Sequence, residues 1–253
     1  MFDFKNEQKN ILDFMSEYLA SSGAKGFCVG LSGGLDSAVV ATLCAKIATT
    51  KVLMMPTASS NKRHIDDAMS LTKALKIEHK IINIQNILDD FTTKCGLYNS
   101  DEKASKMRIG NIAARIRMVL LYDYSAQHNL LVVGTSNKSE RMLGYGTIYG
   151  DMACALNPLA HIFKSDLFDF ARFLGVSESI IAKPPSADLW QDQSDESELG
   201  FSYAELDSVL KGICDGLDKD TLSAKFGAQK AEFVLKRVKN NAFKLKMPAT
   251  LQG

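Results

Sequence analysis

The chain has 253 residues, of which 46% are hydrophobic and 23% are charged, so it is long enough for one sizeable globular domain. A formal net charge of +1 excludes long-range capture of nucleic acid by a strongly basic surface, so any anionic ligand must be held by a local site. No segment approaches the ~20 apolar residues of a membrane span, and the N-terminus has no signal-peptide pattern. The five cysteines include no C-x-x-C pair, which argues against a zinc or redox motif and predicts reduced thiols in a cytoplasmic protein.

The first part of the chain alternates between helical and strand patterns. Periodicity predicts helices over 5–21, 37–47 and 61–76, and strands over 26–30, 51–55 and 79–83. This alternation predicts the α/β class, with a parallel sheet, helices on both of its faces and right-handed crossovers. The expected fold is therefore a three-layer, doubly wound parallel sheet.

The second part is richer in helices. A long helix is predicted over 102–127, a strand over 130–134, and helices over 164–174, 203–212 and 227–240. One face of the long helix is apolar, formed by Ile109, Ile112, Ala113, Ile116, Val119 and Leu120. No repeat or linker divides the chain, so a single domain over 1–253 is predicted.

Residues 184–200 stand out as a polar stretch between these helices. They begin with Pro184-Pro185 and include an acidic run over 192–198. Such a composition is a poor core element, and the sequence predicts a mobile lid here.

The strongest local signal is the hexapeptide SGGLDS at 32–37, between a predicted buried strand and a predicted helix. Its paired glycines let the backbone turn sharply, so that successive N–H groups form an anion-binding nest at the positive end of the helix. The segment has neither the G-K-[ST] of a Walker A motif nor a G-x-G-x-x-G fingerprint. The plainer interpretation is a helix start with a serine N-cap, but the full hexapeptide in this context favours a phosphate site.

Asp36 lies inside this predicted phosphate site, where its charge would repel a bare phosphate. The carboxylate is compatible with phosphate if a divalent cation lies between them, and Mg²⁺ is the usual choice. The sequence therefore predicts a magnesium-dependent phosphate site with Asp36 as a metal ligand.

SGGLDS after a first strand resembles the pyrophosphate loop of the N-type ATP pyrophosphatases, which cleave ATP to AMP and pyrophosphate. Four further segments resemble the NAD synthetases of that superfamily, in the same order along the chain: GNIAARIRM (110–118), GTSNKSE (134–140), KPPSADL (183–189) and QSDESELG (193–200). The resemblance covers almost the entire chain and implies an adenine nucleotide alpha hydrolase-like fold. It also implies a ligase that joins ammonia to nicotinic acid adenine dinucleotide with ATP, giving NAD, AMP and pyrophosphate in the last step of NAD biosynthesis.

The same resemblance implies a set of ATP-binding residues. These are Gly30, Leu31, Ser32, Gly33, Gly34, Leu35, Asp36, Ser37, Thr135, Lys164 and Ser186. Glu140 is expected to join Asp36 as a second Mg²⁺ ligand, and Asp36 and Lys164 are the expected catalytic residues.

Three residues are expected to bind the dinucleotide substrate by resemblance: Arg115, Asp151 and Lys244. In the family, the helix that carries Arg115 also contributes to a dimer interface, so a homodimer is expected. Without that resemblance, Arg115 would be interpreted as a solvated arginine on the polar face of a helix.

The sequence departs from the family pattern at three positions. Phe243 replaces a histidine, Ile148 a lysine and Ala155 an aspartate. The sequence of residues 144–155 looks more like that of glutamine-dependent relatives. Those relatives carry an N-terminal glutaminase domain, for which we expect no room here, because the chain begins almost at the first synthetase helix. We therefore expect the chain to accept ammonia itself; a separate glutaminase partner is compatible with the sequence, but no feature points to one.

The implied chemistry needs no side-chain nucleophile. A carboxylate would first attack the α-phosphorus of ATP and displace pyrophosphate, and ammonia would then displace AMP from the mixed anhydride. The protein must position two anionic reactants and neutralise the charge that develops.

Two other kinds of function compete with this one: another enzyme of the same superfamily, or a non-catalytic nucleotide sensor. Sulfur-transfer or lysidine-forming tRNA enzymes of the same superfamily would need a basic RNA-binding surface and often paired cysteines, and neither is visible. GMP synthetase would need an amidotransferase partner, and QSDESELG argues against it. A non-catalytic adenine-nucleotide sensor would not need Asp36, Glu140 and Lys164 together.

Overall fold

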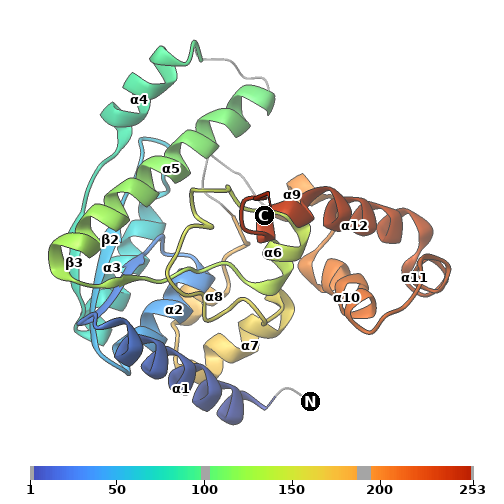
Figure 1. Ribbon diagram of the computed structural model, residues 1–253, viewed down its shortest axis with the longest axis horizontal. Coiled ribbons are helices and arrows are strands. Elements are labelled where there is room, and N and C mark those ends of the chain that lie inside the picture. Colours follow the sequence, from blue (N-terminus) through green and yellow to red (C-terminus); the bar gives the residue numbers. More distant parts are fainter. Residues whose placement is uncertain (1–2, 98–102, 187–194, 252–253) are drawn as a thin grey trace.

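The structure is a computed structural model that describes residues 3–97, 103–186 and 195–251 (Figure 1). Its helices and strands, in chain order, are α1 (Phe4–Ser22), β1 (Gly26–Gly30), α2 (Leu35–Ala45), β2 (Thr49–Met54), α3 (Lys62–Leu75), β3 (Glu78–Ile81), α4 (Gln85–Lys94), α5 (Lys103–His128), β4 (Leu131–Val132), α6 (Lys138–Leu143), α7 (Lys164–Leu174), α8 (Glu178–Ile181), α9 (Asp195–Leu199), α10 (Tyr203–Cys214), α11 (Lys219–Phe226), α12 (Ala228–Asn241) and the 3-10 helix η1 (Ala242–Leu245).

In the part of the chain that the structure describes, four parallel strands form the sheet, in the order β3-β2-β1-β4. The first strand, β1, lies inside the sheet and pairs with β2 on one side and β4 on the other. Because all strands run the same way, their carboxyl ends meet at one edge, where α/β proteins commonly bind ligands. The predicted parallel α/β fold is confirmed.

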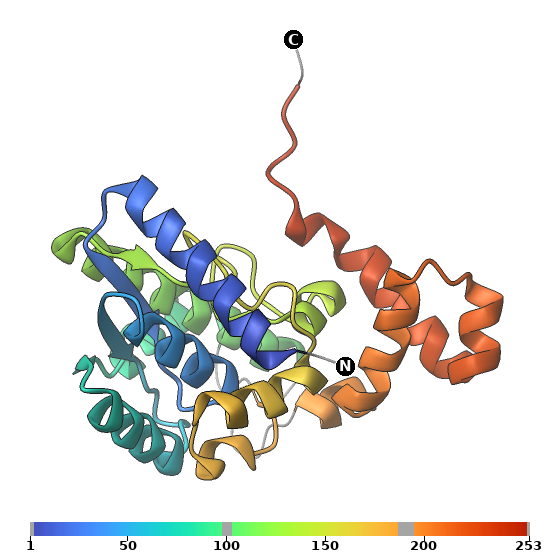
Figure 2. The same cartoon turned by 90° about the horizontal axis from the view of Figure 1, so that it is seen from below.

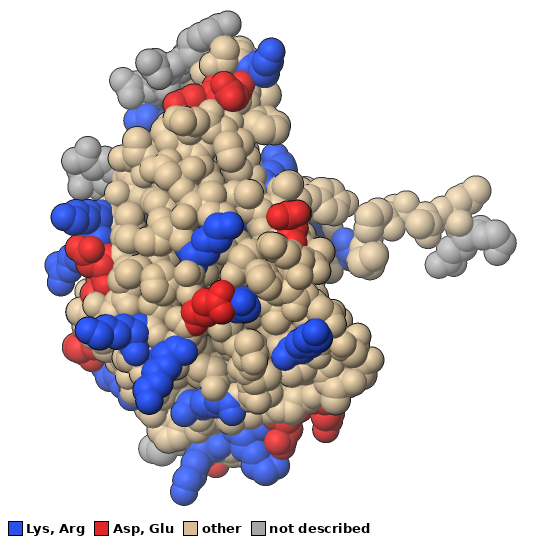
Figure 3. All heavy atoms as spheres, turned by 90° about the vertical axis from the view of Figure 1, so that its left-hand side faces the viewer, with Lys and Arg blue, Asp and Glu red and all other residues tan. Residues whose placement is uncertain are grey.

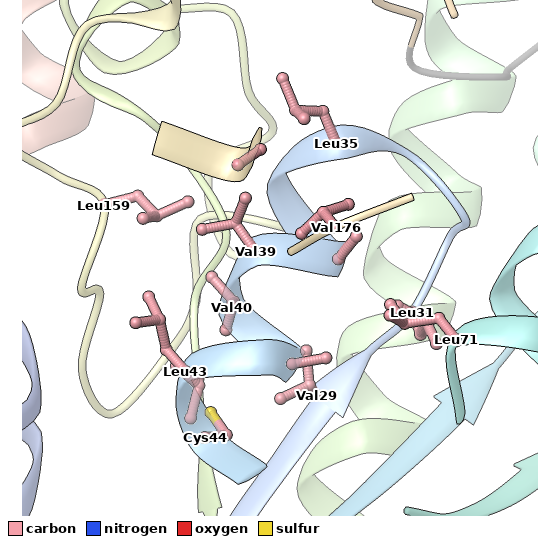
Figure 4. Close-up of a cluster of buried hydrophobic side chains, with 14 of the residues drawn as sticks. Val29, Leu31, Leu35, Val39, Val40, Leu43, Cys44, Leu71, Leu159 and Val176 are labelled. Atoms are coloured by element: carbon pink, nitrogen blue, oxygen red, sulfur yellow. The ribbon is translucent and has the colours of Figure 1, made fainter. Parts of the chain in front are cut away.

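Alternate residues of β1 face two different hydrophobic layers, as the pleat of a strand requires. Phe27 and Val29 belong to a core cluster with buried residues of α1, α2 and α7, whereas Cys28 belongs to a second cluster with residues of α4 and α5. Figure 4 shows Val39, Val40 and Leu43 of α2 in the first cluster, together with Val29 of β1. Helices therefore cover both faces of the sheet, which gives the three predicted layers.

The C-terminal helices have a hydrophobic cluster of their own. Leu206, Val209 and Leu210 of α10 are fully buried in it, together with residues of α6, α11 and α12. These helices lie to one side of the sheet in Figure 1, and Figure 2 shows the chain after η1 leading away from them. The cluster reaches back to Phe163, the residue before α7, so it touches the layer of helices that covers the sheet.

Several predicted elements differ from the structure. Periodicity failed to predict α6 and α8, which have only six and four residues and are too short to show a repeat. It also missed α4 and α11. The strand predicted over 130–134 is shorter because Val133 forms only an isolated bridge with Leu156. Val119 was assigned to the apolar face of the long helix, but its side chain is 59% exposed.

The surface carries acidic and basic side chains interspersed on the face shown in Figure 3. Over the part of the chain that the structure describes, no helix combines the length and apolar character needed to cross a membrane. All five cysteines are free thiols, as the sequence predicts.

Candidate active site

A cavity of about 870 Å³ opens at the carboxyl ends of β1, β2 and β4. Most of the predicted ligand-binding residues line it: Gly30, Leu31, Ser32, Gly34, Leu35, Asp36, Ser37, Thr135, Glu140, Asp151, Lys164, Ser186 and Lys244. Gly33 and Arg115 are not among its lining residues. The cavity thus brings together residues from segments that are far apart in the sequence.

The predicted phosphate loop runs directly from β1 into α2. The helix begins after Gly34, which provides no side-chain cap, so the first N–H groups of α2 have no capping side chain. Ser32 Oγ instead accepts a hydrogen bond from the Gly34 N–H (3.2 Å), and Ser37 Oγ donates to the Gly34 carbonyl (3.1 Å). The serine N-cap interpretation is therefore wrong, and the start of α2 suits an anionic ligand.

Asp36, Glu140 and Lys164 meet beside this loop. Lys164 Nζ donates to Asp36 Oδ2 and, at 3.2 Å, to Glu140 Oε1. The side chains of the three residues are 16%, 15% and 4% exposed, respectively, so water screens their charges little. The two predicted metal ligands thus lie close enough together to share one cation, which here is the Lys164 ammonium.

Burial and neighbouring charge control the protonation of this cluster. Burial raises the pKa of Glu140, and the charge of Asp36 raises it further, to about 8, although Lys164 opposes the shift. Burial alone would lower the pKa of Lys164, but the charges of Asp36 and Glu140 outweigh it and the pKa is raised. Lys164 therefore keeps its proton at neutral pH, whereas Glu140 is poised to exchange one.

The residues predicted to bind the dinucleotide gather around residues 144–148, the segment that follows α6. Asp151 accepts a hydrogen bond from the Thr147 N–H (2.9 Å), and Lys244 donates to the carbonyls of Gly144 (2.8 Å) and Gly146 (2.9 Å). Arg115 is exposed on α5 and donates to the Ile148 carbonyl at 3.4 Å. All three residues thus contact the backbone of residues 144–148, and Arg115 does so without lining the cavity.

The three positions that depart from the family pattern have different surroundings. Phe243 is 60% exposed on η1, and Ile148 is partly buried. Ala155 packs against the main hydrophobic cluster, and its N–H donates to the Val132 carbonyl (2.8 Å). An aspartate at 155 would bring a carboxylate against that apolar cluster, which is unfavourable without a partner.

Part of the predicted lid lies outside the described residues, namely 187–194. The residues that follow form α9, in which Asp195 and Leu199 are only 3% and 2% exposed. Asp195 Oδ2 accepts a hydrogen bond from the buried Tyr203 hydroxyl (3.1 Å). The prediction that the acidic run is poorly suited to a core is therefore wrong at Asp195.

Comparison with known proteins identifies the family. The model of the family described as NAD synthase matches residues 7–248, almost the whole chain. The chain belongs to the NAD synthase family.

Individual members are similar over their full length. An NH(3)-dependent NAD(+) synthetase of Campylobacter jejuni is 47% identical over 252 residues, which cover 99% of each chain. The solved structure of NMN synthetase from Francisella tularensis has a TM-score of 0.89 at 33% identity, with both chains fully covered. NH3-dependent NAD synthetase from Campylobacter jejuni subsp. jejuni, solved with a nitrate ion, has a TM-score of 0.83 at 41% identity and covers 99% of this chain and 100% of its own. The resemblance stated from the sequence is confirmed.

Sequence reasoning missed the residues that hold the acidic pair of this NAD synthase site in place. Asn137 is fully buried and caps α6 in a reciprocal capping box with Glu140. Its amide Nδ2 also donates to Asp36 Oδ1 (2.8 Å), and its backbone N–H donates to Glu140 Oε2 (3.2 Å), so one residue orients both carboxylates. Arg117 lines the cavity and donates to the Met55 carbonyl (3.1 Å), although Arg115 was the arginine predicted from the same segment.

Asp207 of α10 performs a comparable task at the start of α7. Phe163, the N-cap of α7, provides no side-chain hydrogen bond, and Asp207 Oδ2 accepts one from the Ser165 N–H instead (2.8 Å). Asp207 Oδ1 accepts from the Ser139 hydroxyl (2.5 Å), and Ser139 Oγ accepts from the Lys164 N–H (2.9 Å). Ser139 precedes Glu140 in the chain, so Asp207 fixes the backbone beside both Glu140 and Lys164.

Asp207→Asn is expected to lower the turnover of ATP by about 10- to 100-fold, the range typical of residues that orient metal-binding side chains. The Ser139 O–H and the Ser165 N–H donate to different carboxylate oxygens, and the amide replaces one of these acceptors with an NH2 donor, so one of the two bonds is lost. Steady-state release of pyrophosphate measures the effect. Glu205→Gln is the matched control, because Glu205 lies on the same helix but is exposed and pairs with Lys230. A folded Asp207→Asn protein with wild-type turnover would show that this buried bond is unimportant for the site.

Proposed function

We propose that the chain catalyses the amidation of nicotinic acid adenine dinucleotide with ammonia, coupled to cleavage of ATP to AMP and pyrophosphate. The observation that carries this proposal is the meeting of Asp36, Glu140 and Lys164 beside the loop at 32–37, in a chain of the NAD synthase family. The product is NAD, and the bond formed is a C–N bond. The free cysteines support a place for this reaction in a reducing cytoplasm.

The first step activates a carboxylate whose oxygen is a poor leaving group. The nicotinate carboxylate attacks the α-phosphorus of ATP, the bond between the α- and β-phosphates breaks, and pyrophosphate leaves. Residues at the start of α2 and Lys164 line the cavity in which this charge develops, so the helix N–H groups and the Lys164 ammonium can serve as donors. Fixed donors of this kind stabilise a transition state without having to reorganise.

The second step uses neutral ammonia as the nucleophile. Ammonia attacks the carbonyl carbon of the mixed anhydride, AMP departs, and the proton that ammonia loses leaves with solvent. Water is the competing nucleophile, so the burial of Lys164 and Glu140 away from solvent favours amidation over hydrolysis.

Mg²⁺ fits the residues that are present, because it prefers carboxylate, phosphate and water oxygens. Asp36 and Glu140 share one cationic group in the structure, and both line the cavity. Among the described residues no group of three or more His, Cys, Asp and Glu side chains could hold a metal. When bound, Mg²⁺ would neutralise charge on the ATP phosphates.

A second candidate substrate is the mononucleotide, nicotinic acid mononucleotide. The NMN synthetase of Francisella tularensis is similar to this chain over its whole length, with a TM-score of 0.89. Its name indicates a product with one nucleotide instead of two. The same carboxylate chemistry applies to both acids, so the choice between them depends on the part of the cavity that holds the adenylate half.

A homodimer would bring Arg115 into the reaction. The exposed side of α5 carries Arg115, Val119 and Tyr122, spaced by four and three residues along one stripe of the helix. Val119 and Tyr122 are 59% and 40% exposed, whereas the opposite face of α5 is used by the core around Ala113 and Ile116. The proposed dimer therefore pairs this stripe with its copy, and ligand contact by Arg115 depends on it.

The first test of the function is a product assay with ATP, Mg²⁺, an ammonium salt and each acid in turn. The wild-type chain is expected to form NAD, read with an alcohol dehydrogenase, and to release equimolar AMP and pyrophosphate. Asp36→Ala is expected to lose about 10²–10³ in kcat, because a positioned group at the reacting phosphates is removed.

Asp169→Ala is the control for that assay, since Asp169 is an exposed carboxylate on α7 that pairs with Arg172. If pyrophosphate is released faster with the mononucleotide than with the dinucleotide, the mononucleotide is the preferred substrate and the proposed substrate is wrong. Absence of ATP cleavage with either acid would support the nucleotide-sensor alternative instead.

The requirement for Mg²⁺ is expected to fall as pH rises. Burial and the Asp36 charge raise the pKa of Glu140 to about 8, so below that pH a proton must leave before the carboxylate can bind a metal. One released proton corresponds to a change of up to about tenfold in metal affinity per pH unit below the pKa. Titrating free Mg²⁺ against turnover at pH 6.5, 7.5 and 8.5 measures this dependence. Glu140→Gln should require more Mg²⁺ and lose most of the pH dependence; an unchanged profile in that variant would assign the proton to another group.

Val119→Asp is expected to convert a dimer into a monomer, because a carboxylate in the middle of the exposed stripe would be buried against its copy. Size-exclusion chromatography with light scattering measures the mass, and Phe173→Asp, at an exposed position on α7, is the control. A monomeric wild-type chain would contradict both the dimer and a ligand-binding role for Arg115.

A further inference from the structure

The backbone of the predicted phosphate loop packs closely against α3 at Gly33. Gly33 has a φ of +81°, a conformation that favours glycine. A Cβ at this position would lie 2.0 Å from the His64 carbonyl oxygen of α3. The loop therefore packs directly on the first turn of α3, and this contact restricts where its peptide planes can lie.

Lys183 contacts the same glycine. Its Nζ donates to the Gly33 carbonyl oxygen (2.6 Å) and lies 2.8 Å from Asp67 Oδ2 of α3. Asp67 Oδ1 in turn accepts a hydrogen bond from the Ser179 hydroxyl of α8 (2.9 Å). The Lys183 and Asp67 side chains are 10% and 14% exposed, so this ion pair is shielded from water.

These contacts keep the Asp67 side chain deprotonated. Burial pushes the pKa of Asp67 up, but the hydrogen bonds from Lys183 and Ser179 outweigh burial and the pKa is lowered. Asp67 is thus a carboxylate at neutral pH and holds the Lys183 ammonium against the Gly33 carbonyl.

This contact determines the direction of the next N–H group. In a trans peptide the carbonyl of Gly33 and the N–H of Gly34 point in opposite directions. With the carbonyl bound to Lys183, the Gly34 N–H points to the other side of the loop, where it donates to Ser32 Oγ (3.2 Å). Gly34 lines the cavity, whereas Gly33 is not among its lining residues. A flipped peptide would instead present a carbonyl oxygen to the phosphates and repel them.

We propose that Lys183, held by Asp67, is a positioning residue that orients the Gly33–Gly34 peptide so that the loop can bind the phosphates of ATP. The inference rests on the proposed ATP-dependent function. It differs from a simpler role for Lys183, in which the ammonium, which also lines the cavity, binds the phosphates directly. In that case Asp67 would compete for the ammonium, and its loss would not weaken ATP binding.

The experiment compares Lys183→Met, Asp67→Asn and the double variant with the wild-type chain. Calorimetry with α,β-methylene ATP measures binding to the phosphate loop without cleavage, and steady-state kinetics gives KM for ATP and for the dinucleotide. Lys183→Met is expected to weaken binding of the analogue and raise KM for ATP by about tenfold, the effect of losing one hydrogen bond to a charged group. Asp67→Asn should act in the same direction, and the double variant should be no worse than Lys183→Met. KM for the dinucleotide should stay within about twofold of wild type, which a general loss of structure would not allow.

Lys73→Met is the matched control, because Lys73 is an exposed lysine near the end of the same helix, α3. Weaker binding in Lys183→Met with wild-type binding in Asp67→Asn would overturn the proposal in favour of a direct phosphate contact. Wild-type binding in Lys183→Met would overturn it altogether. A wild-type chain that binds the analogue but forms no NAD would contradict the proposed reaction, and the comparison of analogue binding among the variants would still decide the role of Lys183.

Discussion

The Lys164 ammonium lies between Asp36 and Glu140 on a side chain that is only 4% exposed to solvent. The arrangement of the site depends on this contact. A buried ammonium is costly unless it is paired and hydrogen-bonded. The pairing therefore requires the start of α2, the first turn of α6 and the start of α7 to lie together at the carboxyl edge of the sheet. Burial, together with the charge of Asp36, raises the pKa of Glu140, so binding of a further cation to this cluster would be coupled to loss of that proton.

Fixed polar groups around Asp36, Glu140 and Lys164 hold these three side chains in position. Asn137 ties Asp36 to the cap of α6, and Asp207 ties Ser139 of α6 to the backbone of α7. Burial raises the pKa of Asp207, while the hydrogen bonds from Ser139 and Ser165 oppose the shift. These groups are buried and lie on helices or, for Asn137, at a helix cap, and side chains locked in this way hold a site more accurately than loops do. At the loop itself, Lys183 and Asp67 hold the backbone at the Gly33 carbonyl.

The sequence predicted the parts of this arrangement that are local in the chain. The helix–strand alternation and the hexapeptide at 32–37 could be interpreted because each is a short-range pattern. Glu140 and Lys164 came only from the family resemblance, since Lys164 lies 24 residues from Glu140 and 128 from Asp36. Asp207 carries no local signal: an isolated aspartate in a helix is usually solvent-exposed, and here its burial follows from packing of α10 against α6 and α7. Lys183 lies within a segment that resembles the family, yet its contact with Gly33 depends on how α3 and α8 meet the loop.

The C-terminal helices help to form the site, because they pack against α6 and α7 and line part of the cavity. Their hydrophobic cluster includes Leu143 and Phe163, which end α6 and precede α7, so its packing fixes the two short segments that carry Glu140 and Lys164. The same helices add cations to the cavity wall, where Arg237 donates to the Leu143 carbonyl (3.1 Å) and Lys244 to the two carbonyls that follow at Gly144 and Gly146. Displacement of α10 or α12 would thus move the acidic centre and release the loop after α6 together. Because the acidic pair is anchored to both clusters, the geometry of the site requires that the sheet and the C-terminal helices keep one fixed relation.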